Sequence, residues 1–153
     1  MRLAVLALGI LSGHMADAAV IKTLSAEPVF PPQIWTVPCT HSLEGEIVAG
    51  DAARLQAELD RLPGQDHDDR NFVLCLTSPG GNLAEGLKIG EIIRANWMAT
   101  YVPQRASCLS ACAVAFMHGR VAFWEYWMNL RVIHPTAVLG FHAPRLDLPP
   151  MDG

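Results

Sequence analysis

One stretch near the middle of the chain constrains the fold most, because a buried strand, a glycine turn and a helix follow one another without a gap. Phe72–Leu76 is a continuous apolar run, which is typical of a strand buried on both faces of a parallel sheet. The turn that follows holds Gly80 and Gly81, whose freedom in φ lets the backbone come close to a ligand. Apolar residues then recur at helical spacing over Leu83–Ala95. This order predicts an α/β fold with a turn that could hold an anion or an oxyanion.

The same order of strand, loop and helix occurs on both sides of this stretch. Upstream, Leu43–Ile47 is predicted to be a short strand and Ala49–Leu62 a helix. Downstream, the predicted strand Ala99–Val102 leads into Ser107–Gly119, where Ser110 stands between a loop of small residues and a buried helix. That serine could cap the helix, or it could be a nucleophile beside the free N–H groups of the first turn. In a parallel sheet such loops meet at the carboxyl edge, where sites form.

The N-terminus has the pattern of a targeting segment. Arg2 precedes the apolar run Leu3–Leu11, and Ala16-Asp17-Ala18 matches a small-residue cleavage site. Residues 1–18 are therefore predicted to be a signal peptide, with an uncleaved leader that anchors the chain to a membrane as the alternative. Either one places the domain outside the cytoplasm, and the periplasm is the expected location. Residues 19–39 contain four prolines, so they are predicted to be irregular or extended and to run over the surface.

Composition limits the partners and the compartment. The net charge is −4 and no run of Lys or Arg occurs, which argues against a nucleic-acid partner. Hydrophobic residues make up 51% and charged residues only 17%, so some apolar surface is expected to meet a partner or a membrane. Four cysteines in an exported chain permit disulfides in three pairings, with buried thiols as the alternative. Cys108 and Cys112 flank Ser110, and a bond between them would staple this turn.

Four motifs occur in the order and spacing of a known peptidase family. They are Gly45-Glu46-Ile47, Ser78-Pro79-Gly80-Gly81, Gly86 with Ile89, and Ser110-Ala111 with Gly119 nine positions after the serine. The chain from Leu43 to Pro144 thus resembles the proteolytic subunit of Clp protease, within the wider group of signal peptide peptidase A and the crotonase fold. The resemblance implies that residues 40–153 form one Clp-like α/β domain of repeated β-β-α units around a mainly parallel sheet.

The resemblance also implies a catalytic pair. Ser110 would be the nucleophile and His142 the general base. His142 stands in the segment Arg131–Pro144, which is similar to the family segment that carries the catalytic histidine, whereas His134 is not at the matching position.

Backbone N–H groups would hold the oxyanion in such a site. The matching groups are those of Gly80 or Gly81 and of Ala111. A peptide or protein substrate would lie extended beside the two glycines and pair through its backbone. No cofactor is implied, and the histidines and cysteines lack any recognised metal-ligand spacing, so no metal is predicted.

Two features depart from the family. Its acidic triad residue lies well downstream of the histidine, but here only Asp147 and Asp152 follow His142, and neither stands at a matching position. The catalytic lysine of signal peptide peptidases is unmatched as well. Three explanations are open: the chain is truncated at its C-terminus, its site works as a Ser–His dyad, or it is an inactive relative. Peptidase activity is therefore expected to be weak or absent.

An incomplete core would leave apolar surface exposed. We expect this surface along Leu139–Phe141 and around Trp124–Trp127, where it would favour a homo-oligomer. Considered on its own, the aromatic cluster Phe123, Trp124, Tyr126 and Trp127 is predicted to be core rather than an interface patch.

Three functions are consistent with these patterns. The first is an exported serine peptidase, and the second is a non-catalytic Clp-fold protein that binds peptides or assembles. The third is a crotonase-like acyl-thioester enzyme, which also uses paired backbone N–H groups but does not need Ser110. A working pair of Ser110 and His142 would distinguish the first from the other two.

Overall fold

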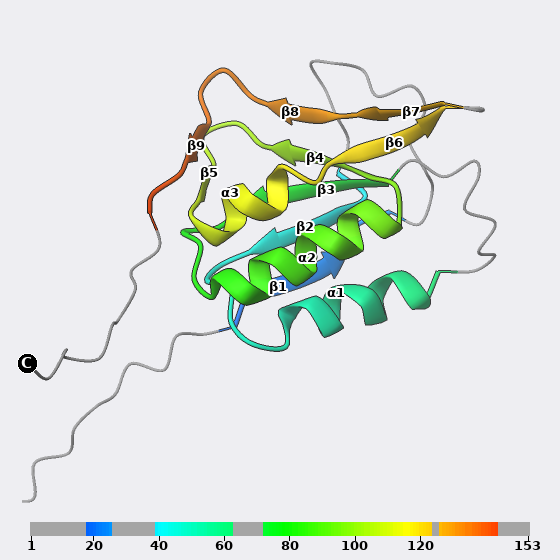
Figure 1. The fold of residues 1–153 in the computed structure, drawn as a ribbon, viewed down its shortest axis with the longest axis horizontal. Coiled ribbons are helices and arrows are strands. Elements are labelled where there is room, and N and C mark those ends of the chain that lie inside the picture. The colour runs from blue at the N-terminus through cyan, green and yellow to red at the C-terminus, as the bar shows by residue number, and fades with distance from the viewer. Residues whose placement is uncertain (1–17, 26–38, 63–71, 124–125, 144–153) are drawn as a thin grey trace, which may run out of the picture.

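The computed structural model describes residues 18–25, 39–62, 72–123 and 126–143. The strands of its main sheet are β1 (Val20–Thr23), β2 (His41–Glu44), β3 (Phe72–Thr77), β4 (Met98–Val102) and β8 (Arg131–Ile133). They lie in the order β1-β2-β3-β4-β8 (Figure 1). Strands β2, β3, β4 and β8 run parallel, and β1 pairs with β2 antiparallel. The prediction of an α/β fold with a mainly parallel sheet is confirmed.

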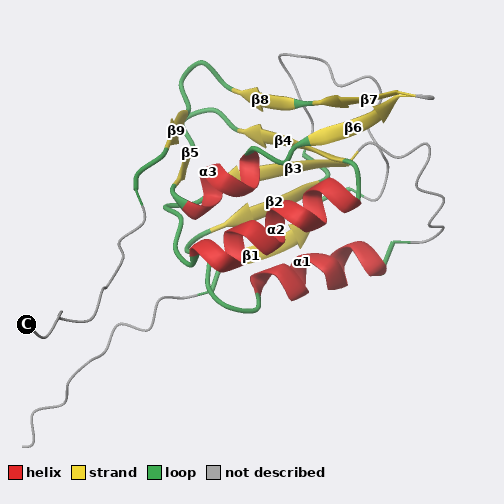
Figure 2. Ribbon diagram, viewed as in Figure 1, coloured by secondary structure: helices red, strands yellow, loops and turns green. Residues whose placement is uncertain are grey.

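Helices cover one face of this sheet (Figure 2). In the described part of the chain they are α1 (Asp51–Asp60), α2 (Leu83–Ala95) and α3 (Ala111–Phe116). Helix α2 packs against both α1 and α3. Its bounds are those predicted, whereas α1 is two residues shorter at each end than the predicted Ala49–Leu62. At the start, Gly50 has a φ of +98° and stands before the first turn, and at the end Arg61 is the C-cap.

Alternate residues of β3 enter different apolar clusters. Leu74 and Leu76 lie in the main core between the sheet and the helices. Val73 and Cys75 lie in a smaller cluster on the opposite face, together with Tyr101 of β4. All four β3 side chains are buried, so the prediction of a strand buried on both faces is confirmed.

A second row of strand pairing lies at the carboxyl ends of the main strands. Strand β5 (Ser107–Leu109) pairs in parallel with β9 (Val138–Gly140). Parallel bridges also join Ser78 to Cys108 and Ile47 to Gly81. Each segment of this row follows a strand of the main sheet along the chain, and three of them lead directly into α1, α2 and α3. The chain therefore repeats the order of main strand, second short pairing segment and helix.

Strands β6 (Arg120–Phe123) and β7 (Tyr126–Asn129) form a separate antiparallel hairpin. Tyr126 is 75% exposed and Trp127 62% exposed, so the prediction that this aromatic cluster is core is wrong for these two residues. The physical reason is that no further layer of structure covers β7 in the described part of the chain. The expectation of exposed apolar surface is confirmed here and at Phe141, which is 59% exposed.

The N-terminal segment differs in part from its expectation as irregular chain. Val20–Thr23 is the edge strand β1, in register with β2 from Val20 opposite Glu44 to Thr23 opposite His41. Residues 1–17 and 26–38, with the predicted leader and the four prolines, lie outside the described residues. No helix in the described ranges is long and apolar enough to span a bilayer.

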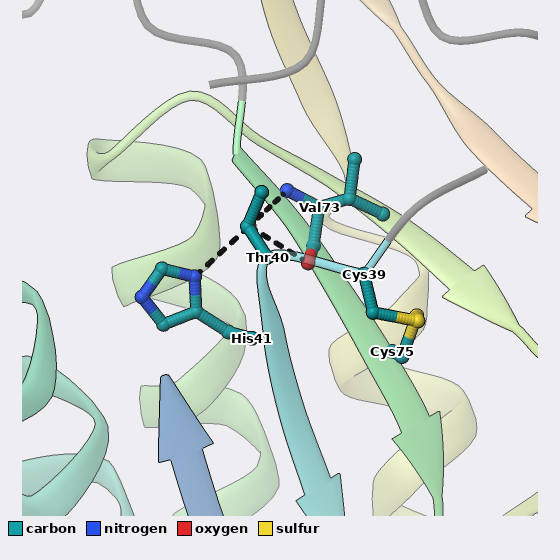
Figure 3. The surroundings of a disulfide bond; sticks show 5 residues. All are labelled: Cys39, Thr40, His41, Val73 and Cys75. Carbon is teal, nitrogen blue, oxygen red and sulfur yellow. Dashed lines mark hydrogen bonds between the residues drawn. A yellow bond between two sulfur atoms is a disulfide. The ribbon is translucent and has the colours of Figure 1, made fainter. Parts of the chain in front are cut away.

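All four cysteines form disulfides, Cys39 with Cys75 and Cys108 with Cys112. Figure 3 shows the first bond beside the Thr40 side chain, which lies between Val73 and the ring of His41. The Thr40 hydroxyl donates to the Val73 carbonyl at 3.1 Å and accepts from the Val73 N–H at 2.8 Å. The disulfide between Cys39 and Cys75 and the two hydrogen bonds of Thr40 together hold the start of β2 against β3.

Candidate active site

Ser110 has a backbone conformation that side-chain-bearing residues rarely adopt. It stands between β5 and α3 with φ of 54° and ψ of −120°. Such strain costs about 1–3 kcal/mol and is concentrated at functional sites, as in the sharp strand-to-helix turns that expose nucleophilic serines. The Ser110 side chain is partly exposed at this turn.

Comparison with the start of α2 shows that Ser110 is not an ordinary helix cap. Asn82 precedes α2 with φ of −65° and ψ of 112°, and its side chain accepts a hydrogen bond from the Glu85 N–H at 3.0 Å. Ser110 has neither the extended conformation nor a side-chain bond to its helix. Its hydroxyl is therefore not occupied by capping.

The Ser110 backbone is fixed on both sides. Its N–H donates to the Gly140 carbonyl at 2.8 Å, and its carbonyl accepts from the Val114 N–H at 3.1 Å. The disulfide between Cys108 and Cys112, both fully buried, closes a short loop around the serine. These contacts hold a strained turn that would otherwise relax.

Gly80 brings the preceding turn directly against Ser110. Its φ is +96°, and a Cβ there would lie 2.7 Å from the Ser110 Cβ and 2.6 Å from the Leu109 carbonyl oxygen. Two hydrogen bonds hold the turn in place, from Ser78 N–H to the Ser107 carbonyl at 2.8 Å and from Leu109 N–H to the Ser78 carbonyl at 3.0 Å. Only glycine permits this approach.

The structure separates the two glycines that were predicted for an oxyanion hole. The Gly80 N–H donates to Ser78 Oγ at 3.0 Å and is therefore occupied. Within the described residues, the N–H groups of Gly81 and Ala111 have no acceptor. The Gly80 carbonyl accepts a hydrogen bond from the Ile47 N–H. The peptide unit that joins Gly80 to Gly81 is trans, so the Gly81 N–H points in the direction opposite to the Gly80 carbonyl. The Gly81 N–H thus points away from Ile47, toward the side on which β5 lies.

Helix α3 starts close to α2 because Gly86 leaves room for it. A Cβ on Gly86 would lie 2.6 Å from the Ala111 carbonyl oxygen and 2.9 Å from its Cβ. One residue earlier, the buried Glu85 carboxylate accepts from the N–H groups of Gly50 and Ala52, both at 2.9 Å. The Ala52 bond, foremost among its contacts, lowers the pKa of Glu85. Glu85 therefore ties α1 to the helix that supports the Ser110 turn.

His142 lies at the same edge of the molecule as Ser110. It comes two residues after Gly140, whose carbonyl accepts the Ser110 N–H, and its side chain is exposed. His142 Nδ1 lies 2.9 Å from the Ala143 carbonyl oxygen. Because a carbonyl can only accept, Nδ1 carries the proton and Nε2 of the neutral ring is left to act as a base. No hydrogen bond joins Ser110 to His142, and no carboxylate of the described ranges contacts this ring.

The other histidines that the sequence offered are used differently. His134 Nδ1 lies 2.9 Å from Thr136 Oγ1 within a surface turn. His118 is partly buried beside Gly90, and its Nδ1 lies 3.0 Å from the Val114 carbonyl. In the described ranges, no three His, Cys, Asp or Glu side chains are grouped so that they could hold a metal ion.

Sequence reasoning missed two residues that shape the site. The Ser78 hydroxyl oxygen accepts a hydrogen bond from the Gly80 N–H. The Ser-Pro-Gly-Gly motif contains this serine but does not indicate which N–H group it binds. Gly140 accepts from Ser110, and only the pairing of β5 with β9 reveals this contact.

No family model, curated protein or solved structure matches this chain.

Proposed function

We propose that this chain is an exported serine peptidase of Clp-like fold, with Ser110 as nucleophile and His142 as general base. The observation that carries the proposal is the strained conformation of Ser110, which frees its hydroxyl from capping and exposes it between β5 and α3. Gly80 adjoins this serine, and the N–H groups of Gly81 and Ala111, which have no acceptor among the described residues, are available nearby.

The order of the elements supports the Clp-like part of the proposal. The chain repeats a main strand, a second short pairing segment and a helix, which is the β-β-α unit that the resemblance implies. Ser110 starts the helix of one unit, and the Ser78–Gly81 turn precedes the helix of the unit before it. Parallel pairing places both at the carboxyl edge of the sheet, where α/β folds bind ligands.

The reaction follows from these groups. Ser110 Oγ forms a bond to the substrate carbonyl carbon while His142 Nε2 takes the hydroxyl proton. The resulting oxyanion accepts hydrogen bonds from Gly81 and Ala111. His142 then gives its proton to the leaving amine as the C–N bond breaks. Water, deprotonated by His142, releases the acyl group and restores Ser110.

Turnover is expected to be slow. The His142 ring is exposed and makes no hydrogen bond to Ser110 in the described structure, and a backbone carbonyl rather than a carboxylate holds its Nδ1. A carboxylate stabilises the imidazolium that forms during catalysis, and a neutral carbonyl does this less well. The substrate would be an extended peptide beside Gly81, bound through its backbone.

Export is supported by two independent features. The predicted leader of residues 1–18 precedes the domain, and all four cysteines are paired in disulfides, which persist in oxidising compartments.

A second candidate function is peptide binding without cleavage. It is favoured by one observation, the absence of a hydrogen bond between the side chains of Ser110 and His142 in the described structure. The acyl-thioester alternative does not need Ser110, so the strain at this residue gives it no support.

Hydrolysis of an unfolded, fluorescently labelled protein by the purified chain tests the proposal. We expect slow cleavage that is lost in Ser110→Ala and retained in the matched control Ser107→Ala. His142→Ala should lower the rate by about 10²–10⁴-fold. Equal rates in Ser110→Ala and the unchanged protein would contradict the proposal, and tight binding without cleavage would favour the second candidate.

A further inference from the structure

A cleft with a volume of about 330 Å³ is lined by residues from the last turn of α2, the segment that follows α3, and strands β6 and β7. The lining side chains are mostly cationic or aromatic, and they are Arg94, Met117, His118, Arg120, Trp127 and Asn129. None of these residues belongs to the site proposed above.

Two guanidinium groups of this cleft lack a carboxylate partner. Arg120 Nε donates to the Arg94 carbonyl at 2.7 Å, and the Arg120 guanidinium stacks over the Trp97 ring at 3.9 Å. Across the described ranges, ion pairs form at Arg54, Arg61 and Lys88 but not at Arg94 or Arg120. Burial and the charge of Arg94 lower the pKa of Arg120, which is still charged at neutral pH. Among the described residues, the cleft thus holds two guanidinium groups that form no ion pair.

Large apolar side chains project beside this charge. Tyr126, Trp127 and Met128 of β7 are 75%, 62% and 51% exposed. Trp127 lines the cleft, and the alternation of a strand directs Tyr126 and Met128 to the other side of the hairpin. Aromatic rings next to cationic groups are the combination that binds at the headgroup level of an anionic membrane.

We propose that this cleft and hairpin dock the protein on an anionic phospholipid surface. A lipid phosphate would enter the cleft between Arg94 and Arg120, where guanidinium groups can bind it through paired hydrogen bonds. Trp127, on the cleft side of the hairpin, would enter the headgroup layer.

A second copy of the chain is the poorer occupant. A two-fold contact through this surface would set Arg94 and Arg120 close to the same two residues of the other copy. Like charges in such an interface repel, whereas lipid phosphates neutralise them. Ser110 stands between β5 and α3, which lie at the left of Figure 1, whereas the β6–β7 hairpin extends to the right. Docking through the hairpin would therefore leave the turn between β5 and α3 open to an extended peptide.

Co-sedimentation of the full chain with vesicles tests the proposal. We expect binding to vesicles of phosphatidylcholine with phosphatidylglycerol, weak binding to phosphatidylcholine alone, and loss of the difference at high salt. Arg94→Gln with Arg120→Gln should weaken binding about 25-fold, because each removed charge counts for about fivefold. Every variant keeps Leu3–Leu11, so any contribution of this apolar segment cancels.

The matched control removes two charges elsewhere. Arg61 and Lys88 have exposed side chains that pair with carboxylates, and Arg61→Gln with Lys88→Gln should reduce binding by less than about threefold. Trp127→Ser, checked for folding by circular dichroism, should weaken binding and abolish the blue shift of tryptophan emission on vesicles.

Three results would overturn the proposal. They are equal binding to both kinds of vesicle, an equal loss in the control pair, and inorganic phosphate binding in the cleft by a chain that does not bind vesicles. If the protein does not bind vesicles but self-associates, and Trp127→Ser abolishes the self-association, the surface binds a second copy of the chain instead.

Discussion

Two regions of this molecule treat apolar residues in opposite ways. In the first region, which comprises β2, α1, β3 and α2, residues such as Leu43, Leu55 and Ile93 are fully buried between sheet and helices. In the second region, which comprises β7, β8 and β9, residues such as Ile133 and Val138 are substantially exposed. The comparison teaches that the position of an apolar residue in the fold, rather than its hydrophobicity alone, decides whether it is buried. We therefore expect the first region to contribute most of the stability, and we propose a contact role for β7 in the second region.

Removing a disulfide from the first region should give the largest effect. Cys39 and Cys75 are 36 positions apart, so Cys39→Ala with Cys75→Ala should cost about 4 kcal/mol of unfolding free energy through lost loop-closure entropy. The disulfide between Cys108 and Cys112 closes a much shorter loop, so Cys108→Ala with Cys112→Ala should cost only about 2 kcal/mol of unfolding free energy. Urea denaturation of both double variants measures this. A larger loss at the shorter loop would contradict the loop-closure explanation.

A matched pair of isoleucines tests the comparison directly. Ile93 of α2 is fully buried, and Ile93→Ala should cost about 3 kcal/mol through lost burial and a residual cavity. Ile133 of β8 is 41% exposed, and Ile133→Ala should cost about 1 kcal/mol or less. Thermal and urea unfolding report both values. Equal losses would mean that the second region is covered in solution, as it would be in an oligomer.

The first region contains a buried histidine whose effect on stability depends on pH. His41 is fully buried, its Nε2 has no hydrogen-bond partner in the described structure, and its ring packs edge-on against Phe72. Burial lowers its pKa from 6.5 to about 4, against a smaller opposing effect of Glu58. The unfolded chain therefore takes up the proton first as pH falls. Stability that is present at neutral pH should be lost progressively from about pH 6.5 toward pH 4.

Urea unfolding at two pH values measures this loss. Between pH 7 and pH 5 we expect a fall of about 2 kcal/mol in unfolding free energy from His41. His41→Phe should abolish most of this slope. The window lies above the range in which Glu85, whose pKa is lowered, would take up a proton. If the pH dependence of the unfolding free energy persists in His41→Phe, another titratable group causes it.

The smallest effect is expected at the exposed hairpin. Tyr126→Ser removes a side chain that is 75% exposed, so unfolding free energy should change by less than about 0.5 kcal/mol. Its solubility should rise at the same time, because the substitution removes exposed apolar surface. A loss above about 2 kcal/mol would show that this ring is buried in solution.

Local patterns allowed much of the first region to be predicted. Helix α2 has the predicted bounds because Asn82 caps its start and apolar residues recur at helical spacing up to Ala95. Strand β3 could be predicted because an apolar run must be buried on both faces. Long-range pairing could not be predicted in the same way. The place of Val20–Thr23 beside β2 depends on a partner 21 positions along the chain on average, which no local pattern encodes.

In the candidate site, too, the features set by local sequence could be predicted and those set by long-range contacts could not. Its loops could be predicted because parallel strands bring them to one edge, and Ser110 was identified from its place before a helix. The conformation of Ser110 and the occupied N–H of Gly80 could not be predicted, since both depend on hydrogen bonds to other segments. For Tyr126 and Trp127, the expectation of an incomplete core predicted exposure correctly, whereas the aromatic pattern on its own predicted burial wrongly, because such a pattern does not reveal whether a covering layer exists.

The most direct test of the central claim is covalent labelling of the folded chain with a fluorophosphonate, read by intact mass and peptide mapping. An activated serine reacts with such a probe even where turnover is slow. We predict one adduct on Ser110 that is absent in Ser110→Ala, is retained in Ser107→Ala and forms more slowly in His142→Ala. Absence of any adduct on the folded protein, or an adduct that survives Ser110→Ala, would contradict the assignment of Ser110 as the nucleophile.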